Sequence, residues 1–309
     1  STYGYDPGAW DMMNFERKSD KIFMRFDYNL AADHKLTARW NYLNAADDNT
    51  PSRGRGLTDI YSEYGRYVID NKTNSIALQL TSLFSNNLSN EVIIGYVRQV
   101  DEPLYKGNPF PSLYIRTLDT TKTDRGNQTL VLGAEQFRHQ NILEQDVIEL
   151  TDNLSYFTGE HTFTVGAKVE FFKFRNLFIP GNYGVYTYNS IADFLNNVRP
   201  AAYEYRYSAT SNPIQDANWG ANQLGFYLQD EWAVSPAFRL TAGVRFDVPI
   251  YPDEPNFNAR IDTFFVQQRG MDIGTNKTPK TTVNISPRIG FNWSIDDERN
   301  TQLRGGVGV

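Results

Sequence analysis

The sequence predicts an all-β fold: an antiparallel up-and-down transmembrane β-barrel segment, about ten strands of a larger outer-membrane barrel. Three observations predict it. First, pairs of stretches that alternate apolar and polar residues flank tight polar turns, and a period of two is that of a β-strand. Second, the turns within pairs are short, whereas the links between pairs are long. Third, aromatic residues make up 14% of the chain, which suits aromatic girdles at two membrane interfaces.

Length and composition limit the class of protein. The chain has 309 residues, enough for one large β domain or two smaller ones. Its mean hydropathy is −0.52, and no apolar run reaches the roughly 20 residues that a spanning helix needs. The absence of cysteine excludes disulfides and thiolate metal sites. The net charge of −6 argues against nucleic acid as a partner, because that binding needs a basic surface.

The strand pairs follow one another along the chain, and each is expected to form an antiparallel hairpin. The turns lie near positions 33, 87, 160, 236 and 297, a spacing too irregular for a propeller or a solenoid. The predicted pairs are 21–30 with 35–44, 75–84 with 91–100, 145–157 with 161–174, 224–234 with 238–248, and 288–295 with 301–309.

One face of every strand is apolar, and what covers that face decides the fold. A soluble sheet would bury it under a second layer, whereas an outer-membrane barrel turns it to lipid and keeps the polar face inside. The short turns and long loops favour the barrel. We therefore expect the following outward side chains to be highly exposed: Trp40, Tyr42, Phe163, Val165, Leu228, Ala242 and Val244.

The opposite face carries mixed charge, as the inner wall of a water-filled or plugged pore requires. An alternative role for these side chains is to pair with one another and with a plug. The residues predicted to face the lumen are Arg25, Arg39, Lys168, Glu170, Arg239, Arg245, Asp247, Arg288 and Arg304.

The long connections, 44–72, 101–141, 175–220 and 249–282, are expected to gather at one end as the ligand-facing surface. Residues 189–196 predict a short helix capped by Asn189 or Ser190. Tyrosine offers a flat apolar ring and a hydroxyl, which suit sugars and peptides alike. The alternative is that the tyrosines stack to hold a long hairpin together. The candidate ligand contacts in these loops are Tyr183, Tyr186, Tyr188, Tyr203, Tyr205 and Tyr207.

Two acids, Asp152 and Asp230, stand on the otherwise apolar face near the short turns. At the membrane interface a charge costs little, and Trp232 would belong to the aromatic belt there. The alternative is that these acids contact a partner at the periplasmic rim.

No constellation predicts catalysis or a metal site. The histidines, His34, His139 and His161, are scattered, and surface or interfacial positions are expected for them. Segments 45–50 and 251–256 carry acids that could offer oxygen ligands to calcium, but neither has EF-hand spacing, so solvated loops are expected. The Arg53–Gly56 segment lacks the strand-to-helix context of a phosphate loop. We predict no catalytic residues, no metal and no cofactor.

Two of the later strand pairs carry distinctive motifs: GFYLQDEW (225–232) with LTAGVRFD (240–247), and SPRIGF (286–291) with LRGGVG (303–308). These hairpins resemble those of the barrels of TonB-dependent receptors. The segments ELTDNLSYF (149–157), NLF (176–178) and IADFL (191–195) are similar to the Oar-like branch, which carries a carboxypeptidase-regulatory-like domain ahead of the plug.

The resemblance implies a 22-stranded barrel with a plugged lumen. Residues 1–309 would be part of its barrel domain. We expect this chain to be an internal fragment, because it shows no signal peptide and stops inside an alternating run. The plug, the TonB box and the C-terminal strands would then lie outside it.

The implied function is energy-coupled import of a large or scarce solute across the outer membrane. The implied partners are outer-membrane lipid, an unidentified solute, and TonB through the N-terminal part. The alternative is a surface-binding or adhesion protein that recognises glycan or peptide through its Tyr-rich loops. A plug and a TonB box in the parent gene would separate the two. An outer-membrane enzyme is disfavoured by the scattered histidines.

Overall fold

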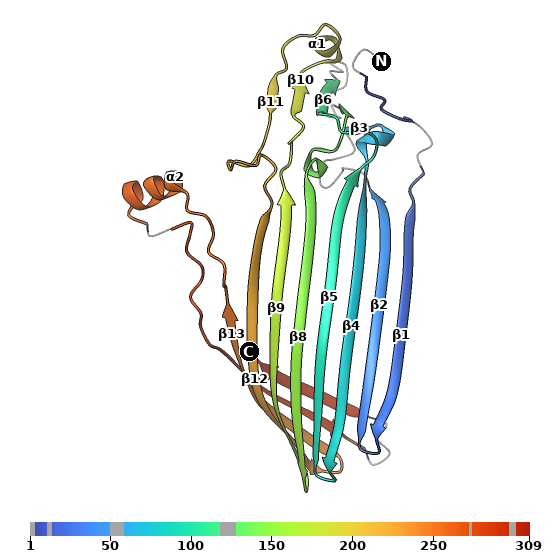
Figure 1. Cartoon of the computed structure of the whole chain (residues 1–309), viewed down its shortest axis with the longest axis vertical. Helices are drawn as coiled ribbons and strands as arrows, with labels where there is room; N and C mark the ends of the chain where they lie inside the picture. The colour runs from blue at the N-terminus through green and yellow to red at the C-terminus, as the bar shows by residue number, and fades with distance from the viewer. Residues whose placement is uncertain (1–3, 11–13, 50–58, 118–127, 272–273, 297–300) are drawn as a thin grey trace.

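The computed structural model describes residues 4–10, 14–49, 59–117, 128–271, 274–296 and 301–309. Ten long strands form one open antiparallel sheet in the order β1-β2-β4-β5-β8-β9-β12-β13-β14-β15 (Figure 1). They are β1 Arg17–Ala31, β2 His34–Asn49, β4 Tyr67–Ser85, β5 Leu88–Tyr105, β8 Asn141–Thr158, β9 His161–Phe178, β12 Ala217–Ser235, β13 Phe238–Ile250, β14 Asn284–Ser294 and β15 Gln302–Gly308.

The predicted hairpins are confirmed, because each long strand pairs with its neighbour along the chain. Gly159 and Glu160 join β8 to β9, and Gly159 has a positive φ of 57° that suits glycine. Asn86 and Asn87 join β4 to β5. In the fifth turn, residues 297–300 lie outside the described residues. These short turns define the turn end of the sheet, and the long connections define its loop end (Figure 1).

The strands run further toward the loop end than the sequence pattern indicates. β5 continues to Tyr105 and β9 to Phe178, whereas the alternation ends near residues 100 and 174. The connections predicted at 44–72, 101–141 and 175–220 are therefore too long, whereas the one at 249–282 matches the observed gap between β13 and β14 to within two residues. Beyond the apolar stretch polar and apolar side chains no longer alternate, so backbone pairing continues where the sequence pattern does not reveal it.

The loops form a second sheet that the sequence pattern does not predict. Its order is β11-β10-β6-β7-β3, and we call it the cap sheet. β10 pairs with β6 in parallel and β3 pairs with β7 in parallel, whereas the ten long strands pair only antiparallel. The cap strands are β3 Asp59–Tyr61, β6 Ser112–Thr117, β7 Gln128–Leu132, β10 Val185–Tyr188 and β11 Ala202–Glu204.

The helices are short and lie in the loops. The helix predicted at 189–196 is confirmed as α1, Ile191–Leu195, and the Ser190 hydroxyl caps it by accepting from the Asp193 N–H at 3.0 Å. α2, Ala259–Asp262, continues into a π-helical turn, and both were missed. No described helix is long and apolar enough to cross a membrane. That π-helical turn is η3, Thr263–Gln267, and the remaining helical turns are η1 Glu63–Gly65 and η2 Gln136–Arg138.

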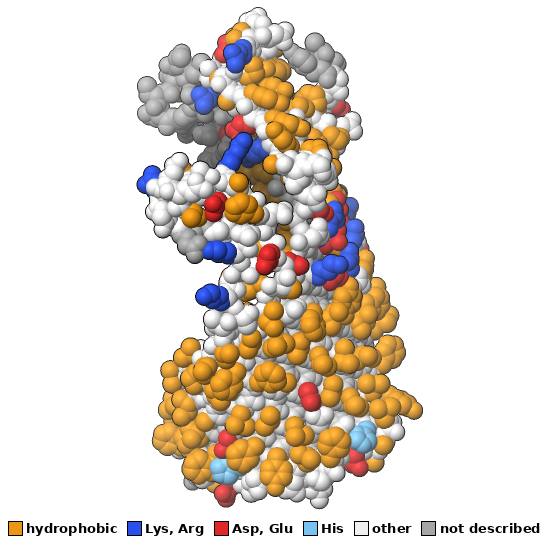
Figure 2. Space-filling view, turned by 60° about the vertical axis from the view of Figure 1, so that its left-hand side comes forward, with side chains coloured by type: hydrophobic (Ala, Val, Ile, Leu, Met, Phe, Trp, Pro, Cys, Tyr) orange, Lys and Arg blue, Asp and Glu red, His pale blue; other side chains and the backbone are white. Residues whose placement is uncertain are grey.

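Hydrophobic side chains cover the turn-end part of the face seen in Figure 2, and charged side chains gather just beyond them. Of the side chains expected to be highly exposed, four are: Phe163, Val165, Leu228 and Ala242. Trp40, Tyr42 and Val244 are half-buried instead. Neighbours on the same face cover them, since the rings of Trp40 and Tyr42 lie 6.3 Å apart and Val244 stands between Leu228 and Pro287 in the register.

The buried apolar core lies at the loop end and not beneath the long strands. It is built from the loop ends of β4 and β9 and from the cap sheet: Tyr67, Leu113, Ile115, Val131, Ala134, Leu177, Ile179 and Val185. At the turn end the apolar face stays exposed over its described residues (Figure 2). A soluble β-sandwich would need a second layer on that face, so the exposed band favours lipid as its solvent.

Candidate functional site

Two of the long loops are joined around the buried imidazole of His139. Its Nε2 lies 3.0 Å from Ser112 Oγ, and its Nδ1 accepts the backbone N–H of Tyr183 at 3.0 Å. The ring of Tyr183 stacks on the imidazole with centroids 4.6 Å apart. His139 thereby ties the start of β6 to the segment before β10. The expectation of a surface or interfacial position is wrong for this histidine, because the loops fold over it.

The Ser112–His139 pair is structural and not catalytic. Because Nδ1 accepts a hydrogen bond, the neutral imidazole carries its hydrogen on Nε2. The Ser112 hydroxyl donates to the Ala134 carbonyl at 2.5 Å, so His139 is not placed to take its proton. Both side chains are fully buried. Burial lowers the pKa of His139 to about 4, which the hydrogen bond to the Ala134 carbonyl only partly offsets.

The tyrosines predicted as ligand contacts do not form one surface. Tyr186 packs on Tyr203 with centroids 4.7 Å apart, and Tyr205 packs on Tyr207 at 5.6 Å. Tyr188 meets the α1 side chain Phe194 edge-on at 5.3 Å. These contacts have the geometry of the scaffold alternative, in which the tyrosines hold the loop together.

Exposure divides the six tyrosines into two groups. Tyr183 and Tyr188 are half-buried, as is Tyr186. Burial, together with a hydrogen bond to Tyr105, raises the pKa of Tyr183. The other three remain accessible to a ligand, with exposed fractions of 56% for Tyr203, 50% for Tyr205 and 61% for Tyr207.

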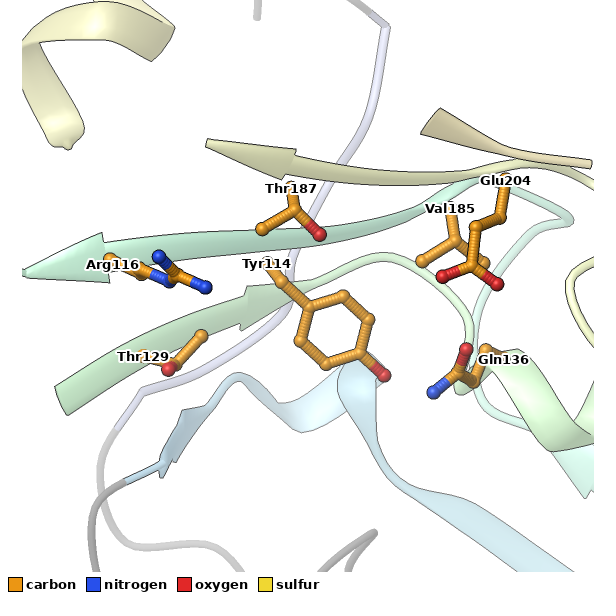
Figure 3. A pocket seen from close by; sticks show the side chains of 7 residues that line it. All are labelled: Tyr114, Arg116, Thr129, Gln136, Val185, Thr187 and Glu204. Carbon is orange, nitrogen blue, oxygen red and sulfur yellow. The ribbon is translucent and has the colours of Figure 1, made fainter. Parts of the chain in front are cut away.

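One face of the cap sheet is hollowed by a cavity of about 220 Å³ (Figure 3). The side chains of Arg116 and Glu204 stand at its two ends. Arg116 donates to the Asn189 side chain at 3.4 Å, and Glu204 pairs with Arg206 at 2.7 Å. The volume is below the roughly 300 Å³ at which ligand pockets begin. The remaining lining residues are Tyr114, Thr129, Gln136, Val185 and Thr187.

A larger cavity of about 710 Å³ lies where the loop after β13 meets the start of β12. It lies within the range of about 300–1,000 Å³ typical of ligand sites. Trp219, which lines this cavity, is not among the predicted site residues. Extending the alternation of β12 backward from Leu224 would have placed Trp219 on the polar face, and that signal was available. The Asp253 side chain, also in the lining, accepts the backbone N–H of Gly220 at 2.5 Å.

The residues predicted to face the lumen all lie on the polar face of the long strands, and that this face lines a lumen stays a prediction. Their cations meet acids or amides on the same face, so the wall is internally paired. The contacts are Arg25–Asp27 at 2.8 Å, Arg39–Gln79 at 2.8 Å, Lys168–Glu170 at 3.1 Å, Arg239–Glu231 at 2.6 Å, Arg245–Asp247 at 2.8 Å, Arg288–Gln229, and Arg304–Gln302 at 2.5 Å.

The two acids on the apolar face each have a polar partner. Asp230 Oδ2 lies 2.8 Å from His161 Nδ1, and the His161 ring stacks on Trp232 at 5.4 Å. Asp152 accepts from the Asn90 amide at 2.5 Å. Neither carboxylate therefore meets lipid alone.

The two acids of segment 45–50 that were considered for calcium are engaged with protein groups. Asp47 pairs with Arg17 at 2.8 Å, and the buried Asp48 lies between Arg66 at 3.4 Å and Lys106 at 2.5 Å. Over the described part of the chain, no three His, Asp or Glu side chains group closely enough to hold a metal ion. Residues 53–56, considered as a phosphate loop, lie outside the described residues.

Comparison with known proteins identifies the kind of domain. A family model described as an outer membrane beta barrel domain matches residues 11–309. No curated protein sequence matches the chain.

Several solved outer-membrane proteins share the fold. The outer membrane transporter YddB from Escherichia coli has a TM-score of 0.55 at 13% identity, covering 95% of this chain and 32% of its own. The ferric-catecholate import receptor Fiu from E. coli K12, in its open form, has a TM-score of 0.56 at 12% identity. The match covers 98% of this chain and 48% of Fiu. The ferripyoverdine receptor of Pseudomonas aeruginosa has a TM-score of 0.56 at 15% identity. The match covers 94% of this chain and 35% of the receptor. The chain thus spans about a third to a half of the length of these proteins.

Proposed function

Because this chain belongs to the outer membrane beta barrel domain family, we propose that it is the barrel part of a TonB-dependent transporter that imports a large or scarce solute. The protein lies in the outer membrane. The observation that carries the proposal is the long antiparallel sheet with an exposed apolar band on one face and a paired polar wall on the other. Only a membrane barrel gives both faces a suitable solvent.

The fold of the neighbours supports a transporter over an adhesion module. YddB is an outer membrane transporter and Fiu is a ferric-catecholate import receptor, and both share this fold. In our proposal the apolar band contacts outer-membrane lipid, and TonB engages the N-terminal part of the complete protein. Energy coupling would act through that part of the complete protein.

The proposed ligand surface lies at the loop end, where the exposed tyrosines are candidate contacts. Replacing Tyr205 by Ala in the full-length receptor removes an exposed ring, whereas replacing Tyr186 by Ala removes a packed one. If Tyr205 contacts the solute, its variant loses uptake at normal surface abundance. If it belongs to the scaffold, abundance falls as it does for the Tyr186 variant.

Transport is tested by growth of the native host with the gene for the full-length protein deleted, on single sources of iron chelate, oligosaccharide or peptide. A strain without TonB serves as the comparison. We expect the deletion strain to lose growth on one nutrient that the strain without TonB also cannot use. Normal growth on every source, together with lost attachment to glycan- or peptide-coated surfaces, would replace transport by adhesion.

A further inference from the structure

We infer that the larger cavity at the loop end binds a neutral oligosaccharide and that, given the proposed transport function, such oligosaccharides are the solute class. The lining residues come from three segments: Thr210 with 215–220 around the start of β12, and 251–256 and 277–279 from the loop that carries α2. Its volume of about 710 Å³ is suitable for a small-molecule ligand.

An aromatic stack runs along the polar face into this cavity. Phe172 and Phe174 lie 6.0 Å apart with rings parallel to within 4°, and Phe174 stacks on Trp219 at 5.3 Å. These rings occupy the same face as Lys168 and Glu170, so lipid contact does not explain them. Burial in the apolar core does not explain them either, because Trp219 is 39% exposed. One side of its indole packs on Phe174, and the exposed part lines the cavity.

Amide groups beside the indole are held in place by a carboxylate. Asp216 accepts from the Asn218 amide at 3.2 Å and from the Gln215 amide at 3.1 Å. Asp216 is in turn fixed by Arg175 at 2.5 Å, and this contact lowers the pKa of its carboxyl group. Because both amide nitrogens donate to Asp216, the amide oxygens are left to accept hydrogen bonds from hydroxyl groups.

The charge of the lining selects against anionic solutes. Arg175 pairs with Asp216, which leaves two further carboxylates of the lining, from Asp253 and Glu254, against one ammonium group, that of Lys277. An anionic ligand would meet a net negative wall. A sugar instead presents C–H faces to an aromatic ring and hydroxyls to amides and carboxylates. It therefore suits both the indole of Trp219 and the polar groups of the lining. A cationic peptide is the competing ligand.

The test measures binding by the purified full-length protein in nanodiscs by isothermal titration calorimetry. The probes are maltohexaose, cellohexaose, laminarihexaose and xylohexaose, with hexalysine as the cationic probe. We expect at least one hexasaccharide to bind and hexalysine not to. Trp219→Ala should weaken that binding by about tenfold or more, as loss of a central aromatic contact does. Trp219→Phe should retain most of it.

Trp10→Ala is the matched control, because Trp10 is 44% exposed but does not line the cavity. It should leave binding unchanged. A difference in SDS-gel mobility between unheated and heated samples checks that each variant has folded as a barrel. Binding of hexalysine alone, or equal affinity in wild type and a folded Trp219→Ala variant, would overturn the inference.

Binding in nanodiscs needs no energy source. The sugar site and the transport function are therefore tested separately, and either can be refuted without the other. A protein that binds a hexasaccharide but supports no TonB-dependent growth refutes the transport proposal and leaves the sugar site standing. Growth on a nutrient without binding of any hexasaccharide refutes the sugar site and leaves transport standing.

Discussion

The neutral state of His139 is expected to make the cap sheet sensitive to acid. In the folded cap its pKa is about 4, against 6.5 for an ordinary histidine. Above pH 6.5 both folded and unfolded loops hold a neutral imidazole, so the stability of the cap is complete. As the pH falls from 6.5 toward 4, His139 is protonated in the unfolded loops but stays neutral in the folded cap. The folded cap therefore loses stability relative to the unfolded loops. The difference amounts to about 3 kcal/mol.

Hydrogen exchange measured at pH 7.5 and pH 4.5, corrected for intrinsic rates, tests this effect. The amides of β6 and β10 should exchange roughly 50-fold faster at the lower pH, while the long strands should not change. His139→Gln should lower protection at both values and remove the dependence on pH. His34→Gln, at the turn end, is the control. Unchanged exchange rates of the β6 and β10 amides at pH 4.5, or the same pH dependence in His139→Gln, would refute the reasoning.

Two further predictions concern the long strands. Gly166→Ala should destabilise the barrel by about 1–3 kcal/mol in denaturant unfolding, because its new Cβ would lie 2.3 Å from the Tyr227 ring. Gly95→Ala, whose Cβ would have 3.6 Å to its nearest neighbour, should be tolerated, and equal losses would count against this packing. Val244→Lys on the lipid-facing band should cost about 2–4 kcal/mol in assembly if it lies near mid-membrane, whereas Thr241→Lys on the polar face should not. A harmless Val244→Lys would argue against lipid contact.

The hairpins could be predicted because their signals are local. Alternation over eight or more residues assigns each side chain to a face, and residues such as Asn87 and Gly159 identify the turns. The Ser190 cap of α1 was predicted for the same reason, since its partner Asp193 lies within one helical turn. The exposure of Trp40 and Val244 was overestimated because packing between neighbours on one face depends on the register.

The loop end could not be predicted in the same way. The cap strands are three to six residues long and pair across distant segments, so they show no alternation of their own. The sequence placed His139 at the surface because nothing near it in the chain indicates that Tyr183 closes over it. The six tyrosines were grouped by composition, and only the fold separated half-buried rings from exposed ones.

The sequence by itself determined the fold class, the turns and the lipid-facing side of each long strand, because a period of two and turn chemistry act between neighbours in the chain. Only the tertiary structure decided what the loops build: the cap sheet, the burial of His139, and the cavity lined by Trp219, Asp253 and Lys277. Those contacts join segments that are far apart in the chain, and the sequence does not show which of them lie close together in space. Their geometry exists only once the long strands have fixed where each loop begins and ends.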